Sequence, residues 1–153
     1  MQSLSKRLKA GFTLVERLIV IGILVVLLAI VLIALNPARQ FSQAKNTARS
    51  SDVNAILNAV HQYAADNKGQ VPGAITGVVQ NISGTAANIC AILVPLYLAQ
   101  LPVDPNTNNG VPVTTDCALP YDTNYQIVKS ATNNRITVSA TAAELGVVIS
   151  VTR

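Results

Sequence analysis

The most prominent pattern in the chain is an apolar run from Leu18 to Leu35 that contains no charged residue. With the residues from Phe12 in front of it, the run can cross a hydrocarbon layer of about 30 Å as a helix, which takes roughly 20 residues. A secretory signal peptide fits less well, because the apolar core is too long and no small-x-small cleavage site follows it. The pattern therefore predicts a transmembrane helix over residues 12–36.

Helical periodicity continues over residues 37–69, where polar residues interrupt it. Two overlapping apolar stripes recur at helical spacing, namely Phe41, Ala44, Ala48, Ala55, Ala59 and Tyr63, and Val53, Ile56, Val60 and Ala64. Five polar residues fall largely outside these stripes: Asn46, Arg49, Asn54, Asn58 and Asn67. The pattern predicts an amphipathic helix whose broad apolar face packs on a core, with Gly69 as its stop.

Pro37 allows two interpretations of the junction between these segments. One helix could run from Phe12 to about Asn67 and be bent at Pro37, because proline lacks an amide hydrogen and crowds the carbonyl of Ile33. A second helix could equally start at this point, with Asn36 as its N-cap and Pro37 at its first position. The sequence leaves both interpretations open.

Strand-like patterns appear in the last third of the chain. Residues 124–130 and 135–141 alternate between apolar and polar positions, and the turn-forming residues 131–134 join them, which predicts a hairpin. Residues 146–152 supply a third strand. A small antiparallel sheet needs a cover for its apolar face, so we expect an α+β fold in which one long N-terminal helix, half membrane-spanning and half amphipathic, packs against the sheet.

Two segments between the helices and these strands are less clear. Residues 87–100 carry an apolar run that fits either a short helix ending near Pro95 or a buried strand. Asp104, Asn106 and Asn108 stand at alternate positions, as in a calcium loop, but the glycine comes one residue late and the closing glutamate is absent. We favour a plain turn at these residues and predict no metal site.

Composition and charge narrow the possible functions. The chain has 153 residues, of which 50% are hydrophobic and 12% charged, and its formal net charge is +4. Lys6, Arg7 and Lys9 supply three of the positive charges, so the remaining chain has eight basic against seven acidic residues. Binding of nucleic acid is therefore not indicated. Basic residues flank the apolar run on both sides, so charge alone leaves its orientation undecided.

No set of residues indicates an active site. His61 is the only histidine, and one histidine offers neither a catalytic triad nor a metal cluster. The sequence has no Gly-x-Ser-x-Gly elbow and no phosphate-binding glycine loop. It predicts neither an enzyme nor a bound cofactor.

The segment Gly11-Phe12-Thr13-Leu14-Val15-Glu16 follows a short basic stretch and begins the apolar run. In this motif the chain resembles the type IV prepilin family, including the pseudopilins of type II secretion. The resemblance implies that residues 1–11 are a leader, cleaved after Gly11 by a prepilin peptidase on the cytoplasmic face, and that Phe12 is then N-methylated. It also implies that the domain with the cysteines is exported.

Glu16 is the residue that the resemblance connects with assembly. Ionisable residues at membrane depth are costly and are functional by default, and Glu16 lies one helical turn from the ammonium that cleavage would create on Phe12. The carboxylate of one subunit could neutralise the ammonium of a neighbour; the alternative is a carboxylate that stays hydrated at the interface. Arg17 departs from the family pattern. We favour its guanidinium snorkelling to the interface over its competing with the ammonium for Glu16.

Cys90 and Cys117 are the only cysteines. In an exported domain an even number of cysteines indicates a disulfide, and two buried free thiols are the alternative. No Cys-x-x-Cys pair accompanies them, so a zinc site is not expected.

These observations predict four segments: a leader over 1–11, a transmembrane and assembly helix over 12–36, an amphipathic helix over 37–69 and an exported domain over 70–153. The resemblance implies a structural subunit of a type IV pilus-like filament. Such a subunit starts as a single-pass inner-membrane protein and ends in a homo-oligomeric, helical cell-surface filament, and its further partners are the peptidase and a pilus assembly platform. Alternatives are a pseudopilin of a type II secretion or DNA-uptake machine, and a membrane-tethered binding module that never polymerises.

Overall fold

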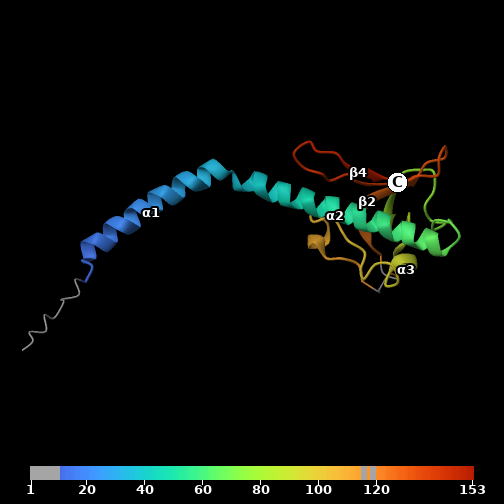
Figure 1. Cartoon of the computed structure of the whole chain (residues 1–153), viewed down its shortest axis with the longest axis horizontal. Helices are drawn as coiled ribbons and strands as arrows, with labels where there is room; N and C mark the ends of the chain where they lie inside the picture. The colour runs from blue at the N-terminus through green and yellow to red at the C-terminus, as the bar shows by residue number, and fades with distance from the viewer. Residues whose placement is uncertain (1–10, 115–116, 118–119) are drawn as a thin grey trace, which may run out of the picture. The chain divides into compact units, whose positions relative to one another are not determined.

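The computed structural model describes residues 11–114, 117 and 120–153, so only Gly11 of the predicted leader lies among the described residues. The chain divides into two compact units, one that ends at Gln40 and one that spans Phe41–Arg153 (Figure 1). Its elements are α1 (Leu14–Leu35), α2 (Pro37–Asp66), β1 (Gln80–Ser83), α3 (Cys90–Leu93), the 3-10 helix η1 (Asn108–Gly110), β2 (Asp122–Lys129), β3 (Ile136–Ala140) and β4 (Ile149–Thr152). The predicted α+β class is confirmed.

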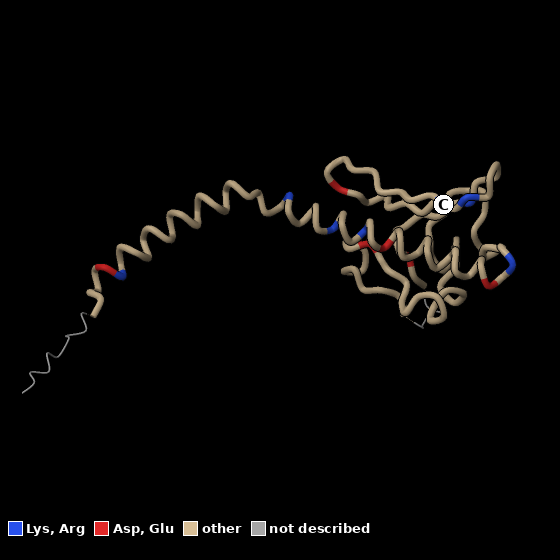
Figure 2. Tube along the Cα trace, in the orientation of Figure 1, with Lys and Arg blue, Asp and Glu red and all other residues tan. Residues whose placement is uncertain are grey.

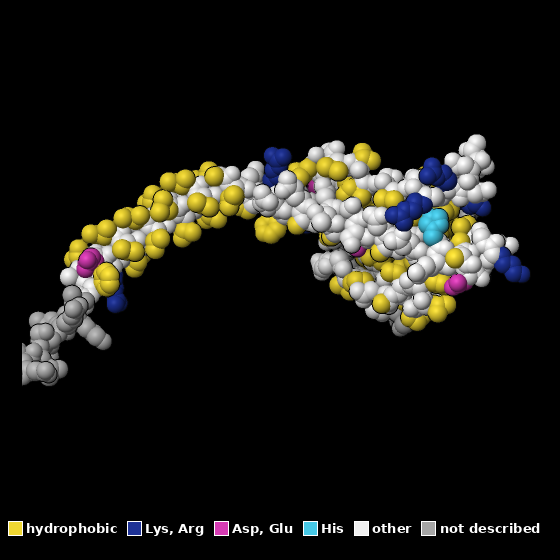
Figure 3. Space-filling model, in the orientation of Figure 1, with side chains coloured by type: hydrophobic (Ala, Val, Ile, Leu, Met, Phe, Trp, Pro, Cys, Tyr) yellow, Lys and Arg dark blue, Asp and Glu magenta, His cyan; other side chains and the backbone are white. Residues whose placement is uncertain are grey.

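Helix α1 has the length and surface of a membrane-spanning helix. Its 22 residues extend about 33 Å at 1.5 Å per residue, which matches a hydrocarbon layer of about 30 Å. None of its residues is buried, and hydrophobic side chains cover it along its length (Figure 3). The described residues of this unit, from Gly11 to Gln40, therefore leave the apolar surface of α1 uncovered.

The junction after α1 follows the second of the two interpretations. Helix α1 ends at Leu35, Asn36 is left-handed with φ 42°, and α2 begins at Pro37. The amide of Arg39 donates to the backbone oxygen of Asn36 at 3.0 Å and to its side-chain oxygen at 3.4 Å. Asparagine tolerates this backbone conformation and proline needs no donor at a first helical position, so two helices form instead of one bent helix.

The sheet has four antiparallel strands in the order β1-β2-β3-β4. The predicted hairpin is β2 and β3, with Ile127 opposite Val138, and the predicted third strand is β4, which begins only at Ile149. Strand β1 was not predicted. It is short, and its register against β2 shifts between Asn81 and Ser83, so it lacks the alternation that identifies a strand in sequence.

Helix α2 and one face of the sheet share a single hydrophobic core. Fully buried residues of α2 are Val53, Ile56, Leu57 and Val60, and those of the strands include Ile82, Tyr125, Ile127, Ile136 and Val138. The uncertain segment 87–100 contains the short helix α3, whose Cys90 and Leu93 enter the same core. Of the two interpretations of that segment, the helix is therefore confirmed.

The buried face of α2 differs from the predicted one at the start of the helix. The stripe of Val53, Ile56, Val60 and Ala64 is buried as expected, whereas Phe41, Ala44 and Ala48 of the other stripe are exposed. Asn46 and Arg49, which we expected outside the apolar face, are buried instead. Loops far along the chain supply polar partners for them, and such partners leave no periodic signal.

Helix α2 ends at Asp66, three residues before the predicted stop at Gly69. The amide of Gly69 donates to the carbonyl of Ala64 at 2.7 Å, and both Lys68 and Gly69 have positive φ values. This closure satisfies a free carbonyl in the last turn, as glycine-terminated helices commonly do.

Candidate functional site

Two groups of residues are candidates for function: the segment that begins α1, and a polar network within Phe41–Arg153. Gly11 and Phe12 are exposed and non-helical, directly before the N-cap residue Thr13. The bond between Gly11 and Phe12 therefore lies in exposed chain without regular secondary structure.

Glu16 closes a capping box at the start of α1. The amide of Glu16 donates to the hydroxyl of Thr13 at 3.2 Å, and the amide and hydroxyl of Thr13 donate to the Glu16 carboxylate at 3.1 and 3.2 Å. A carboxylate is also favourable at this end of a helix because of the helix dipole. Sequence reasoning missed this role, although Thr-x-x-Glu before an apolar run is its signature.

Arg17 is exposed beside Glu16, and the two are the charged residues of α1 (Figure 2). The structure describes both side chains and places no ion pair within 4.0 Å between them. Glu16 is instead held by Thr13. Whether Arg17 snorkels to a membrane interface or competes with the ammonium for Glu16 stays a prediction.

The predicted disulfide between Cys90 and Cys117 is present, with the two Cα atoms 5.6 Å apart. Cys90 is the first residue of α3 and is fully buried in the core. The bond therefore links Cys117 to the hydrophobic core.

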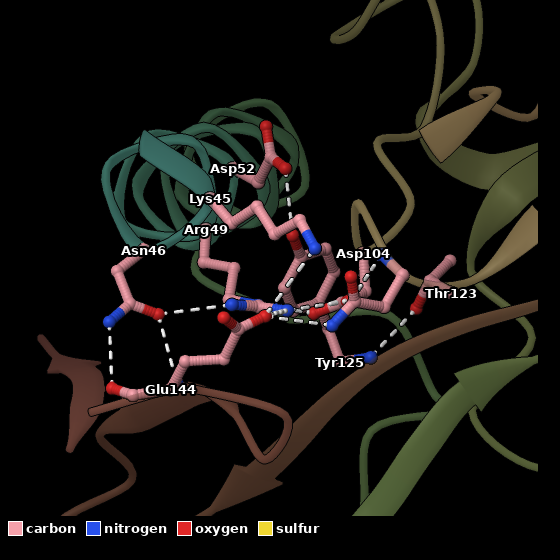
Figure 4. A network of polar contacts seen from close by, with 9 residues as sticks. Lys45, Asn46, Arg49, Asp52, Asp104, Thr123, Tyr125 and Glu144 are labelled. Atoms are coloured by element: carbon pink, nitrogen blue, oxygen red, sulfur yellow. Dashed lines mark hydrogen bonds and ion pairs between the residues drawn. The ribbon is translucent and has the colours of Figure 1, made fainter. Parts of the chain in front are cut away.

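The polar network is centred on Arg49 of α2 (Figure 4). Its guanidinium donates to both oxygens of Asp104, from Nε at 2.7 Å and from Nη2 at 3.1 Å, and from Nη1 to the side-chain oxygen of Asn46 at 3.0 Å. The Glu144 carboxylate lies 3.5 Å from Nη2. Arg49 and Asp104 are both fully buried, and the hydrogen bonds that Arg49 donates to the Asp104 carboxylate raise the pKa of Arg49.

Glu144 is held from several sides in the loop between β3 and β4. The side chain of Asn46 pairs with the backbone of Glu144 in both directions, at 2.8 and 3.0 Å. Hydrogen bonds from Ser42 and Asn106, followed by the positive charges of Lys45 and Arg49, lower the pKa of the Glu144 carboxyl to about 2. The carboxylate is therefore ionised at all ordinary pH values.

Tyr125 connects the sheet to the same region of α2. Its hydroxyl donates to the carboxylate of Asp52 at 2.7 Å. Burial raises the pKa of Asp52, and the hydrogen bond from Tyr125 partly opposes this rise. The pKa of Tyr125 is itself raised, first by burial and then by the bond to Asp52. The Tyr125 hydroxyl therefore stays protonated and acts as a hydrogen-bond donor, in keeping with a structural role.

The residues considered for calcium are used within the protein. Both oxygens of Asp104 accept hydrogen bonds from Arg49, and one also accepts from the amide of Asn106. The side-chain nitrogen of Asn106 donates to Glu144 at 3.0 Å, while Asn108 begins η1. Across the part of the chain that the structure describes, no three metal-ligating side chains gather.

No family model, curated protein or solved structure matches this chain. The fold and the sites define its class: an α+β protein with one N-terminal helix able to span a membrane and a disulfide-linked folded unit.

Proposed function

We propose that this protein is a structural subunit of a type IV pilus-like filament. The observation that carries the proposal is the position of the motif from Gly11 to Glu16. It stands immediately before and within the first turn of a 22-residue apolar helix, and the Gly11–Phe12 bond is exposed. The motif resembles the prepilin cleavage and methylation site, and the accessible chain at Gly11 is what a peptidase needs.

The chemistry of Glu16 supports the same proposal. Cleavage after Gly11 places an ammonium on Phe12, next to the Thr13 amide that already donates to Glu16. A carboxylate at this place can neutralise the new ammonium within the chain or in a neighbouring copy. An unpaired charge in an apolar layer is costly, so a partner for the ammonium favours assembly in a defined register.

The two units are suited to the steps that such a subunit passes through, namely membrane insertion, cleavage and assembly. In this proposal α1 holds the precursor in the inner membrane as a single span, and the peptidase cleaves it from the cytoplasmic side. An assembly platform then moves the processed chain into a helical homo-oligomer at the cell surface. The Cys90–Cys117 bond suits a domain on the oxidising side of the membrane.

The test is recovery of surface fibres from cells that express the full chain. Shearing, electron microscopy and mass spectrometry of the N-terminus should find fibres whose chains begin at methylated Phe12. Gly11→Val should block processing, because a β-branched side chain burdens a site that accepts a minimal one, while Gly11→Ala is the milder control.

Three outcomes would count against the proposal or redirect it. Fibres built from chains that begin at Met1 would contradict the processing step. Processed chains that stay monomeric in the membrane would favour a tethered binding module. Short fibres that appear only with an active secretion or DNA-uptake machine would favour a pseudopilin.

A further inference from the structure

Phe41 is an exposed aromatic side chain in the second turn of α2, close along the chain to the end of α1. It is 69% exposed, and the protein has only one other phenylalanine. That residue is Phe12, which lies just before α1 and is 75% exposed. An exposed aromatic ring therefore stands close to each end of the apolar helix.

The length of chain keeps Phe41 near the end of α1. Residues 37–41 belong to the single helix α2, which rises about 6 Å from the first of them to the last. Only Asn36 separates α2 from Leu35, and this connection spans at most about 7 Å. The Cα atom of Phe41 therefore lies within about 13 Å of the Cα atom of Leu35, for every angle between the two helices.

Insertion of α1 in a membrane would place Phe41 in the headgroup layer. The run without charge begins at Leu18, and a hydrocarbon layer of about 30 Å takes about 20 helical residues, which end at Pro37. The headgroup layer beyond it is about 5–7 Å thick. Phe41 lies about 6 Å further along the helix than Pro37, and a tilt of α2 would bring it closer to the hydrocarbon.

The other large apolar side chains exposed on the same unit are not held in this way. Val78, Leu96 and Val111 are examples, and each comes at least 37 residues after Phe41. A chain of that length does not confine them to the end of α1. Proximity to the membrane therefore distinguishes Phe41 from them.

Arg39 adds a charge that suits the same layer. It precedes Phe41 by two residues in α2 and is exposed. Among the described residues, no carboxylate pairs with it within 4.0 Å. A guanidinium binds phosphate through two parallel hydrogen bonds, and lipid phosphates lie in the headgroup layer.

We propose that Phe41 and Arg39 bind the start of α2 to the headgroup layer while α1 is inserted in the membrane. The inference rests on the membrane-inserted precursor of the proposed function and names a contact of that state. The ring lies against the ends of the acyl chains, and the guanidinium binds lipid phosphate. Helix segments bind a membrane surface through this combination of an apolar side chain and a basic one.

The experiment uses the full chain in vesicles of phosphatidylethanolamine and phosphatidylglycerol. The protein has no tryptophan, so Phe41→Trp introduces a single fluorescent probe and the parent chain is the blank. The acyl chains carry bromine, which quenches tryptophan, either near the headgroup or near the bilayer centre. We expect blue-shifted emission from Phe41→Trp and stronger quenching by the shallow bromines than by the deep ones.

Two other single-tryptophan variants are the controls. Val78 is 68% exposed, almost as much as Phe41, and Val78→Trp should emit as in water without quenching. Leu24 lies in the middle of α1, so Leu24→Trp should be quenched most by the deep bromines and thereby report insertion. Retention of the Cys90–Cys117 bond in each variant checks that the folded unit is intact.

Arg39→Gln in the Phe41→Trp chain tests the contact with phosphate. One basic residue near an anionic surface changes binding about fivefold. The ratio of quenched to unquenched tryptophan, measured from time-resolved emission, should therefore fall about fivefold. Arg135→Gln removes the same charge from another exposed position of the folded unit and should leave the ratio unchanged.

The opposite results separate this contact from the proposed function. Quenching of Leu24→Trp without quenching of Phe41→Trp would overturn the contact and leave the inserted precursor standing. No quenching of Leu24→Trp would overturn the inserted precursor, and the contact with it. Equal quenching of Val78→Trp and Phe41→Trp would contradict a contact specific to Phe41. An unchanged ratio in Arg39→Gln would overturn the part of the proposal that concerns Arg39.

Discussion

Arg49 shows what a single residue contributes to this structure. Its guanidinium is removed from water and satisfied by the Asp104 carboxylate and the Asn46 side chain, with Glu144 close by. Removing two charges from water costs several kcal/mol per ion, and their attraction offsets that cost only with good geometry and further hydrogen bonds. The network therefore fixes where the loops that carry Asp104 and Glu144 contact α2.

At this scale we predict that Arg49→Met destabilises the folded unit by about 3–5 kcal/mol, because the buried, charged Asp104 loses its cationic partner. Asp104→Asn in the same chain should recover much of the loss, since the asparagine oxygen can still accept from the Asn106 amide. Denaturant unfolding of the single and double variants measures both values. Additive losses in the double variant would show that the two residues do not interact energetically.

Among the elements, α3 illustrates how a weak helix is held in place. It has only four residues, far fewer than an isolated helix needs to be stable in water. Its position depends on Leu93 and Cys90 in the core, and on the bond from Cys90 to Cys117. The hydroxyl of Tyr121 also accepts a hydrogen bond from the Cys90 amide at 3.3 Å.

For this element we predict that Cys90→Ser with Cys117→Ser lowers the free energy of unfolding by a few kcal/mol. Closing a loop of 27 residues contributes roughly 3.5 kcal/mol in the chain-entropy model. Denaturation of the double-serine variant against the parent chain measures the change, while membrane insertion and cleavage should be unaffected. An unchanged unfolding midpoint would mean that packing alone fixes α3.

The chain combines an apolar helix, which the described residues of its unit leave uncovered, with a folded unit that has its own hydrophobic core. In a membrane, lipid would cover α1. In the proposed filament, other copies must take the place of lipid, and the charges at Glu16, Arg17 and the new N-terminus must be accommodated in an apolar setting.

Glu16→Val tests this change of surroundings. Insertion should persist, because the span becomes more apolar, and cleavage should persist, because the leader and Gly11 are unchanged. Assembly should fail or be greatly reduced, since the Phe12 ammonium would lose its partner. The fibre yield relative to processed protein in membranes is the measurement.

Two further variants make the Glu16 test more specific. Glu16→Gln keeps the acceptor for Thr13 and removes only the charge, so a defect in it would isolate the charge. Arg17→Leu should leave assembly intact if the guanidinium of Arg17 only snorkels to the membrane interface. Normal fibres from Glu16→Val would leave Glu16 as a helix cap alone.

The sequence by itself determined the features that local patterns encode. The uncharged run specified α1, because length and hydropathy alone decide whether a helix can span a membrane. Alternation around residues 131–134 specified the β2–β3 hairpin, because turn residues between two alternating runs bring neighbouring segments together. The Cys90–Cys117 bond was predictable because the chain has only two cysteines and their domain was expected to be exported.

Only the tertiary structure decided which face of α2 is buried near its start. Arg49 is buried because Asp104, 55 residues away, meets it, and Asn46 because the Glu144 backbone, 98 residues away, meets it. Helical periodicity registers apolar spacing and cannot register a polar partner on a distant loop. For the same reason periodicity did not predict that Phe41 and Ala44 are exposed. The distant loops pack on the other side of the helix.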